Sequence, residues 1–328
     1  MLKVAKKRYP KNSAGALMTD KVPIAFLTST ILEVEKYLKR KKDKLESINY
    51  IYTIDKSGIL KGAVSIKEIF RQGKHRKLKE FIDGKPIIVS PYTTGERVAN
   101  LALKNNIKSV PVVNKEGEFL GVVLSDTILE IAYLESQEDL SLLAGIEDPE
   151  LSKGGEKISV FSSLKNRLPW LIIGLFGGFL MSRTITSFES TLAENLILAS
   201  FIPLVVYIGA AVQTQIGYFI VRDLAFNPKL NFLFYAFRQF KVVLLIGFSL
   251  SVLVFLSTFI FYTDLAIAFV LALAIFLATL SSIITGVLIP FIFHRLKFDP
   301  ASASGPIATI IQDLTSILIY LLVAKSLL

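Results

Sequence analysis

The sequence predicts a soluble α/β domain built from two repeats, followed by an all-α membrane domain of five transmembrane helices. Charge is spread unevenly along the chain: residues 1–167 contain 29 Lys and Arg and 21 Asp and Glu, whereas residues 168–328 contain only 8 and 6. Five long apolar segments fill the second half, and an internal repeat with strand and helix patterns fills the first. We therefore expect the first half to be soluble and the second to lie in a membrane.

The composition excludes several kinds of function. The 328 residues include no cysteine, which excludes disulfide bonds, thiolate catalysis and cysteine-ligated zinc. The two histidines lie far apart in basic surroundings. The apolar segments contain no obvious acid dyad or histidine–carboxylate pair, and the chain has no G-x-x-x-x-G-K-[ST] phosphate-binding loop. We therefore expect that the protein is not an enzyme.

Residues 1–16 form a basic lead with five Lys and Arg side chains. Such an arm binds either anionic lipid or nucleic acid. Tyr9 is the only aromatic residue among these charges and a membrane domain follows, so we expect membrane lipid as a partner and no nucleic acid. The apolar stretch of a cleavable signal peptide is not visible, and the soluble half is therefore expected in the cytoplasm.

An internal repeat makes up the soluble domain, which we place at residues 17–135. Residues 51–69 and 110–128 align without a gap at an offset of 59 residues. Each copy contains an apolar β-rich run, a polar turn that ends in Gly, a second run, and a helix that begins at a polar cap. A further helix is expected before each copy, at about 30–44 and 94–106. One copy cannot bury its own apolar face, so the two should pack as a pair.

Two stretches give this repeat a family resemblance: LMTDKVPIAFLTST at its start and PVVNKEGEFLGVV in the second copy. Both resemble a cystathionine-β-synthase (CBS) domain pair. Such pairs often bind adenine nucleotides through a Gly-x-x-Ser/Thr-x-x-Asp signature, and the first copy has Gly62, Ser65 and Glu68 at these places. The resemblance implies ATP or another adenine nucleotide as a ligand of these residues. The alternative is a regulatory scaffold without nucleotide.

Residues 116–152 carry ten acidic residues and no Lys or Arg. Carboxylates in such a stretch can hold hard divalent cations, although a solvated helix face is an alternative explanation. The stretch connects the repeat pair to the first apolar segment, and this position favours the sensing of a cation. The candidate regulatory ligands are Asp126, Glu130, Glu135, Glu138 and Asp139, in a run that ends with Glu147, Asp148 and Glu150.

A connecting helix, expected over 136–166 with a break at Gly154 and Gly155, leads into the membrane domain at 167–328. Each of its five apolar segments can cross a bilayer core of about 30 Å. Lys and Arg gather at one set of segment ends, which predicts a cytoplasmic N-terminus and an external C-terminus in the plasma (inner) membrane. The segments are 168–187, 194–221, 236–262, 265–293 and 304–326.

Polar residues inside the segments are concentrated in the second and the fifth. Asp313 lies in an otherwise apolar or small run, and a carboxylate there costs several kcal/mol unless a cavity or a cation solvates it. Thr309 is four residues earlier and shares its helix face. Oxygen ligands of this kind suit a hard cation that keeps much of its water, such as Mg²⁺. In the second segment, Gln213 and Gln215 are candidates either for the ion path or for hydrogen bonds between helices.

Three stretches of the membrane half carry a second resemblance: LPWLIIGLFGGFL, IPLVVYIGAAVQTQ and IPFIFHRLKFDPASASGPIATIIQDLTSILIYL. Together with a CBS pair and a connecting helix, they are similar to the MgtE-type magnesium transporters and channels. That resemblance implies a homodimer with its pore at the subunit interface. It also implies that Asp313 is the pore aspartate, with Ala308 and Thr309 one turn before it, and that regulatory Mg²⁺ binds at the acidic stretch.

Two features depart from that family. Only the basic lead precedes Leu17, where members usually have an additional acidic helical domain, and Gly209 to Gln213 replace a run of glycine and asparagine. We predict transport of divalent cations, with Mg²⁺ as the expected ion, through a dimeric pore that the CBS domains regulate. Two alternatives stay open: a Na⁺-coupled Mg²⁺ exchanger of the same fold, and a membrane-tethered nucleotide or ion sensor without transport.

Overall fold

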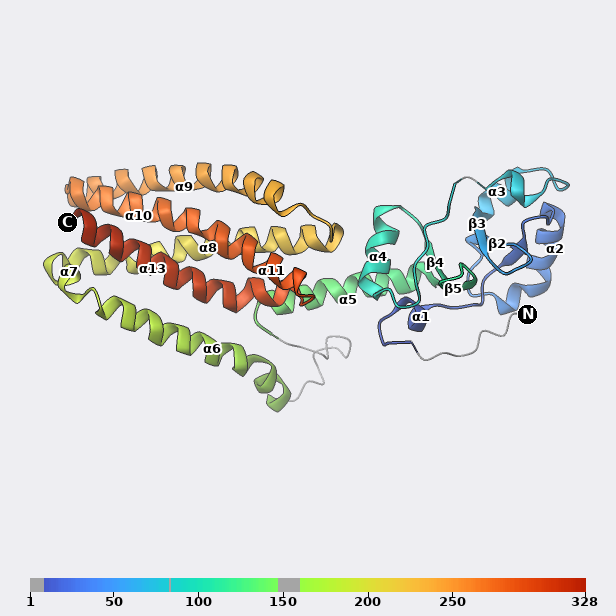
Figure 1. Cartoon of the computed structure of the whole chain (residues 1–328), viewed down its shortest axis with the longest axis horizontal. Coiled ribbons are helices and arrows are strands. Elements are labelled where there is room, and N and C mark those ends of the chain that lie inside the picture. The colour runs from blue at the N-terminus through green and yellow to red at the C-terminus, as the bar shows by residue number, and fades with distance from the viewer. Residues whose placement is uncertain (1–8, 83, 147–159) are drawn as a thin grey trace. The chain divides into compact units, whose positions relative to one another are not determined.

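The computed structural model describes residues 9–82, 84–146 and 160–328, and Figure 1 shows the chain coloured along its length. The chain divides into two compact units, Met1–Glu135 and Ser136–Leu328. The first unit contains the two copies of the repeat, and the second contains the long apolar helices.

The first copy of the repeat forms a three-stranded sheet with helices against it. Its elements are β1 (Ile24–Phe26), α2 (Ile31–Lys41), η1 (Lys42–Lys44), β2 (Tyr50–Ile54), β3 (Leu60–Ser65), α3 (Ile66–Arg71) and η2 (Leu78–Glu80). β1 runs parallel to β2, and β2 runs antiparallel to β3. Thr30 begins α2 with a capping box, because the Thr30 and Glu33 side chains each accept a hydrogen bond from the other residue's backbone N–H. Apolar side chains from α2, α3, η2 and the sheet form one core.

The second copy repeats this plan. Its elements are α1 (Ala14–Leu17), α4 (Gly95–Lys104), β4 (Ser109–Val113), β5 (Phe119–Leu124) and α5 (Ser125–Leu143). β4 and β5 are antiparallel, and all five residues of β4 are buried, which explains its nearly continuous apolar sequence. The strands and helices of both copies lie where the repeat pattern predicts them, so the predicted α/β repeat pair is confirmed.

The hairpin turns of the two copies bond to each other. Gly58 and Gly117, which align in the repeat, have φ angles of 81° and 84°, a left-handed conformation that glycine adopts without steric cost. Leu60 N donates to Gly117 O at 3.1 Å, and Phe119 N donates to Gly58 O at 3.0 Å. Equivalent residues of the two copies thus make equivalent hydrogen bonds to each other's turns.

Tyr52 joins the two copies through its side chain. The ring of Tyr52 stacks on Phe119 with centroids 5.2 Å apart and an interplanar angle of 22°. Its hydroxyl shares a hydrogen bond with the Ser109 hydroxyl. Only 2% of Tyr52 is exposed, and this burial raises the pKa of the Tyr52 phenol to about 12.

The second unit contains, among the described residues, five helical spans long and apolar enough to cross a membrane. The fourth and fifth spans each contain a π-helical turn, which the sequence analysis did not predict. The spans are α6 (Val160–Thr186); α8 (Leu196–Phe226); α9 (Phe232–Tyr262); α10 (Leu265–Ile283) with η5 (Ile284–Leu288) and α11 (Ile289–Arg295); and α12 (Pro300–Ser302) with η6 (Ala303–Ile307) and α13 (Ala308–Leu327). A short helix, α7 (Glu189–Glu194), joins α6 to α8.

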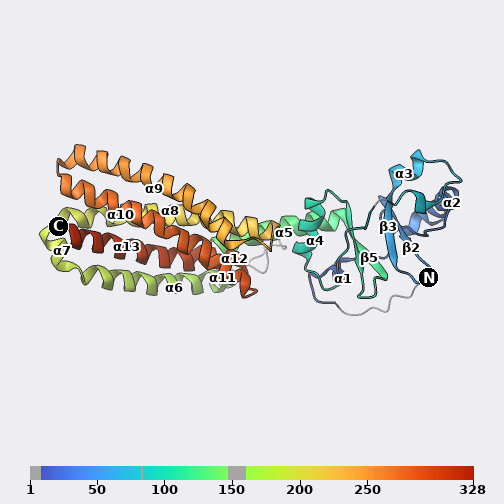
Figure 2. The ribbon, with the colours of Figure 1, turned by 45° about the horizontal axis from the view of Figure 1, so that its top comes forward.

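Helices α8, α10 and α13 pack around a shared apolar core, with α9 against α10 and α6 against α13 (Figure 2). Small side chains such as Ala274 and Ala278 alternate with large ones such as Leu271 and Ile275, and this pattern lets the helices approach closely. The Tyr320 hydroxyl donates to Leu198 O at 2.7 Å, so α13 is also tied to α8 by a buried hydrogen bond.

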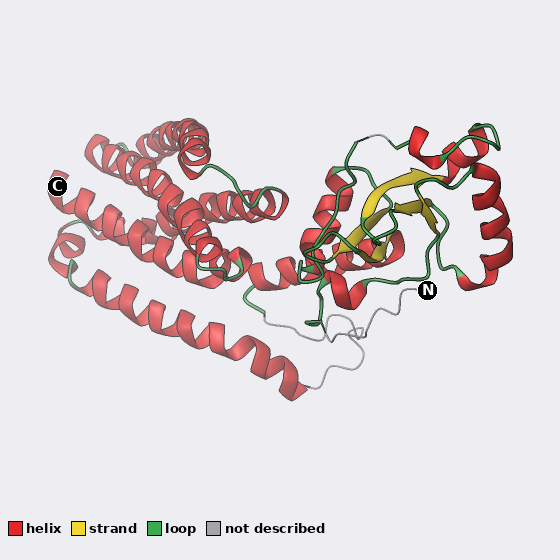
Figure 3. Ribbon diagram, turned by 45° about the vertical axis from the view of Figure 1, so that its right-hand side comes forward, coloured by secondary structure: helices red, strands yellow, loops and turns green. Residues whose placement is uncertain are grey.

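The connecting region differs from the single helix expected over 136–166. Its first residues complete α5, which ends at Leu143, and its last residues begin α6 at Val160. Residues 147–159 lie outside the described residues, and with them the expected break at Gly154 and Gly155. Among the described residues, Figure 3 shows strands in the first unit and helices in the second, so the predicted fold class is confirmed.

Burial of Tyr52 generates a prediction for alkaline pH. Free tyrosine has a pKa of about 10, and that of Tyr52 is raised to about 12, so the folded state holds this proton more tightly than the unfolded chain. The resulting stability, about 2–3 kcal/mol, is complete below a pH of about 10 and is lost as the pH rises toward 12. Tyr52→Phe should remove this loss from the pH profile of the melting temperature.

A matched control is Tyr92→Phe, because Tyr92 lies in the same unit and is exposed. It should leave the profile of the wild type unchanged. If Tyr52→Phe lost stability over the same pH range and to the same extent as the wild type, another group would be responsible.

Candidate ion pathway

Asp313 lies on α13, in the fifth apolar span. Its Oδ1 atom is buried and, among the described residues, has no hydrogen-bond partner. Buried carboxylate oxygens normally accept several hydrogen bonds, since an unpaired one is costly in an apolar environment. An atom in this state is available to a ligand that the chain itself does not provide.

The residues before Asp313 form an irregular start to the span. Gly305 in η6 has φ −79° and ψ −124°, which is not helical. The Thr309 hydroxyl lies 3.2 Å from Gly305 O and 3.4 Å from Gln213 Oε1, and can donate to either. Ala308 is fully buried. The prediction that Thr309 and Asp313 lie one turn apart on one helix is therefore compatible with the structure, although Thr309 is already hydrogen-bonded within the chain.

The two glutamines of α8 have different surroundings. Gln213 is fully buried, and its Nε2 donates to Ser304 O at 3.3 Å. Through this bond and the contact with Thr309, Gln213 fastens α8 to the start of the fifth span. Gln215 is exposed on α8 in the single chain. The structure thus brings Gln213 and Thr309 together and leaves Gln215 apart from them.

Gln312 is a polar residue whose importance the sequence analysis missed. It is fully buried, and its Nε2 lies within hydrogen-bonding distance of Ala278 O (3.2 Å), Ser281 Oγ (3.1 Å) and Ser316 Oγ (3.0 Å). Its Oε1 accepts a hydrogen bond from Thr285. The available signal was an amide inside an apolar segment, directly next to Asp313.

The residues after α5 pack on the start of the fifth span, within the second unit. Gly145 has φ +72°, and a Cβ at this position would collide with the Pro306 ring. A Cβ at Gly305 would lie 2.9 Å and 2.8 Å from the carbonyl oxygens of Leu142 and Leu143. Both glycines are therefore required by close approach, and the turn that follows α5 sits against η6.

The acidic residues proposed as regulatory ligands are not gathered into one site within the described chain. No group of three or more His, Asp or Glu that could hold a metal ion is present among the described residues. Asp126 and Glu130 are four residues apart on α5, but Glu135 is nine residues from Asp126, which places it about 180° around the helix. Glu138 and Asp139 follow in the second unit, and Glu147, Asp148 and Glu150 lie outside the described residues.

The candidate nucleotide residues meet at the corner between β3 and α3, but each is already engaged. A Cβ on Gly62 would lie 2.6 Å from Ile82 Cγ2, so the Ile82 side chain covers this strand surface. The Ser65 hydroxyl caps α3 by accepting from Lys67 N at 3.3 Å. Gly62 and Ser65 are thus engaged within the chain, and nucleotide binding at this corner stays a prediction from the sequence.

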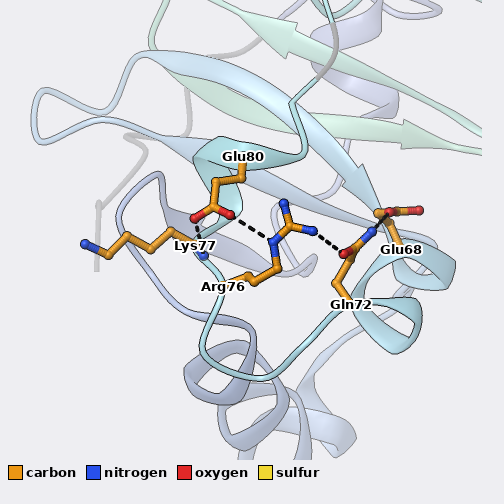
Figure 4. Close-up of polar contacts among 5 residues, drawn as sticks. All are labelled: Glu68, Gln72, Arg76, Lys77 and Glu80. Carbon is orange, nitrogen blue, oxygen red and sulfur yellow. Dashed lines mark hydrogen bonds and ion pairs between the residues drawn. The ribbon is translucent and has the colours of Figure 1, made fainter.

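Glu68 takes part in a chain of polar contacts (Figure 4). Its Oε1 accepts from Gln72 Nε2, and Gln72 Oε1 accepts from Arg76 Nη1 at 2.6 Å. Arg76 Nε donates in turn to Glu80 Oε2 at 2.9 Å, and this bond lowers the pKa of Glu80 below its usual value. The Glu68 carboxylate is therefore held by the chain's own side chains.

Comparison with known proteins shows which families the sequence matches. The family model for MgtE, described as a divalent cation transporter, matches residues 202–323, and the CBS domain model matches residues 78–133. The magnesium transporter MgtE of Thermus thermophilus is 31% identical over 332 residues, covering 98% of this chain and 71% of that protein. The chain belongs to the MgtE family. MgtE of Bacillus subtilis is similar at 30% identity over 324 residues, or 97% of this chain and 70% of that protein.

Among solved structures, the cytosolic domain of the Mg²⁺ channel MgtE in complex with ATP is 32% identical, covering 39% of this chain and 51% of that one with a TM-score of 0.38. Membership of the MgtE family confirms the resemblance inferred from the sequence. It also confirms that the chain is not an enzyme, because the family is one of transporters. With its five apolar helices, the chain is a multi-pass membrane protein.

The packing of Gly62 against Ile82 gives a prediction for the first unit. Gly62→Ala should lower the free energy of unfolding by about 1–3 kcal/mol, because the added methyl group overpacks the contact. In the double variant with Ile82→Ala this cost should disappear, so the two effects will be less than additive in denaturant titrations. Gly73→Ala is the control, since a Cβ there meets open space. Additive effects would mean that Ile82 does not cover Gly62.

Proposed function

We propose that this chain is one subunit of a homodimeric Mg²⁺ transporter in which Asp313 contacts the permeating ion. The observation that carries the proposal is the buried Asp313 Oδ1, which has no hydrogen-bond partner among the described residues. A carboxylate in an apolar span without an internal partner is stabilised when a cation supplies the missing interaction. With one such acid in each chain, a dimer would offer two carboxylates to an ion that keeps much of its water, as Mg²⁺ does.

Exposed apolar side chains at equivalent positions of the repeat support a homodimer. Phe70 on α3 and Leu129 on α5 are equivalent positions of the repeat, 59 residues apart, and are 74% and 62% exposed. Large apolar side chains that are exposed at equivalent places commonly mark a surface that a partner covers. A second copy of the chain would cover them.

The cations of the second unit support a cytoplasmic N-terminus and CBS pair, with the C-terminus outside. Arg222 lies over the Phe219 ring, Lys241 over Phe237 and Arg295 over Phe291, an arrangement typical of residues at a membrane interface. The positive-inside rule assigns these ends to the cytoplasm of a plasma (inner) membrane. The membrane potential then drives Mg²⁺ inward, with about 4.6 kcal/mol for a divalent ion at 100 mV.

Contact between the turn after α5 and η6 supports regulation by the CBS pair. Helix α5 begins in the first unit, and its last residues belong to the second. The carboxylates of α5 are the proposed site of regulatory Mg²⁺, completed by residues of a second subunit. Binding there would shift the end of α5 and, through Gly145 and Pro306, the start of the ion pathway.

The first test is Mg²⁺ flux into proteoliposomes under a voltage, with and without an opposing Na⁺ gradient. Asp313→Asn should abolish flux, because the amide loses the charge that attracts the ion, while the oligomeric state stays that of the wild type. Asp264→Asn is the matched control: Asp264 caps α10, and Asn caps helices as well as Asp. Wild-type flux in Asp313→Asn would remove Asp313 from the pathway.

The Na⁺ arms of the same experiment separate the alternatives. Flux driven by voltage alone indicates a channel. Flux that requires the Na⁺ gradient indicates the Na⁺-coupled exchanger, and absence of flux under every condition favours the membrane-tethered sensor.

A second test addresses regulation. In Gly145→Ala the new methyl group would collide with Pro306. The alanine backbone would also have to adopt a positive φ, at a cost of about 1–2 kcal/mol. The turn after α5 should then leave η6, and flux should lose much of its dependence on internal Mg²⁺. Gly73→Ala serves as the control. An unchanged dependence in Gly145→Ala would show that this contact does not transmit regulation.

A further inference from the structure

Gln312 connects α13 to the fourth span through several side-chain hydrogen bonds. Both ends of its amide are used: Nε2 faces Ala278 O and Ser281 Oγ on α10, and Oε1 accepts from Thr285 in η5. The side chain is fully buried, so water does not compete for these bonds. An amide in this setting has a single orientation that satisfies both its donor and its acceptor.

Helix α8 also packs closely against Gln312. Gly209 of α8 lies directly against this cluster, and a Cβ there would meet Ser316 Oγ and would lie 3.0 Å from Gln312 Nε2. About one turn earlier, the Thr309 hydroxyl lies 3.4 Å from Gln213 Oε1 and ties α13 to α8. Both ties lie within the turn that precedes Asp313, and they attach its helix to two different neighbours.

We infer that Gln312 is a positioning residue for ion binding: its bonds to α10 and η5 hold α13 in the rotational setting that turns Asp313 toward the ion pathway. Adjacent residues of an α-helix point about 100° apart, so fixing the Gln312 amide on one side of α13 fixes the direction of Asp313. The inference rests on the proposed function, because it assumes that Asp313 contacts the ion. It adds a residue that never touches the ion and yet determines its affinity.

The test compares two variants that each remove a buried hydrogen bond of α13. Gln312→Leu has a similar volume and no amide. Tyr320→Phe removes the Tyr320 to Leu198 bond, two turns further along the same helix and away from Asp313. Both should lower the melting temperature. Only Gln312→Leu should raise the half-saturating Mg²⁺ concentration for flux, by about tenfold, equivalent to ~1.4 kcal/mol.

A second readout follows the direction of residue 313 without relying on transport. The chain has no cysteine, so Asp313→Cys provides a single thiol whose rate of reaction with a charged thiol reagent reports its access to water. Adding Gln312→Leu should slow this reaction, whereas adding Tyr320→Phe should leave the rate unchanged. Ser281→Ala, which removes one partner of Gln312, should shift both readouts in the same direction by a smaller amount and serves if Gln312→Leu does not fold.

The outcomes distinguish this inference from the proposed function. If the wild type carries Mg²⁺ and Asp313→Asn does not, but Gln312→Leu has the wild-type half-saturation and thiol reactivity, the positioning role is wrong and the proposed function stands. Equal shifts in Gln312→Leu and Tyr320→Phe would also overturn it, since they would reflect general loss of stability. Absence of any flux that depends on Asp313 would overturn both.

Discussion

Lack of water inside the five apolar spans is the constraint on which the membrane unit depends. A buried polar side chain there is costly unless it finds a partner. The hydroxyls of Ser281 and Ser282 bond back to carbonyl oxygens of their own helix, and the amide of Gln312 gathers donors and acceptors from two helical segments. Three buried side-chain atoms among the described residues have no partner, Tyr235 Oη, Thr279 Oγ1 and Asp313 Oδ1, and only the last belongs to an acid.

In the first unit, buried polar groups are satisfied in part by hydrogen bonds between the two copies of the repeat. The two copies exchange backbone bonds through their glycine turns, and Tyr52 adds a ring stack and a hydroxyl bond across the junction. The copies have diverged in charge: the basic residues concentrate in the first, whereas the second leads into the acidic α5. Equivalent backbones therefore present different surfaces, which is what a regulatory pair requires if each copy is to meet a different ligand or partner.

Much of this arrangement could be predicted from the sequence, because it follows from period and length. The strands and helices of the repeat follow from the alternation of apolar residues around Gly58 and Gly117, and the spans follow from their length. Asp313 stood out as an acid among apolar neighbours.

Pattern alone could not decide which face of α8 is buried: Gln213 and Gln215 are two residues apart and point about 200° apart around the helix. The bond from Thr285 to Gln312 joins residues 27 apart in the chain, so no local pattern indicates it.

The π-helical turn η5 has a consequence for how this chain is compared with its relatives. A π turn closes its hydrogen bond one residue later than an α turn, so it accommodates one additional residue without breaking the helix. An ungapped alignment through Ile284–Leu288 therefore matches the same faces only in relatives that carry the same turn. In any relative without it, residues beyond the turn correspond in space to neighbours one position away in sequence.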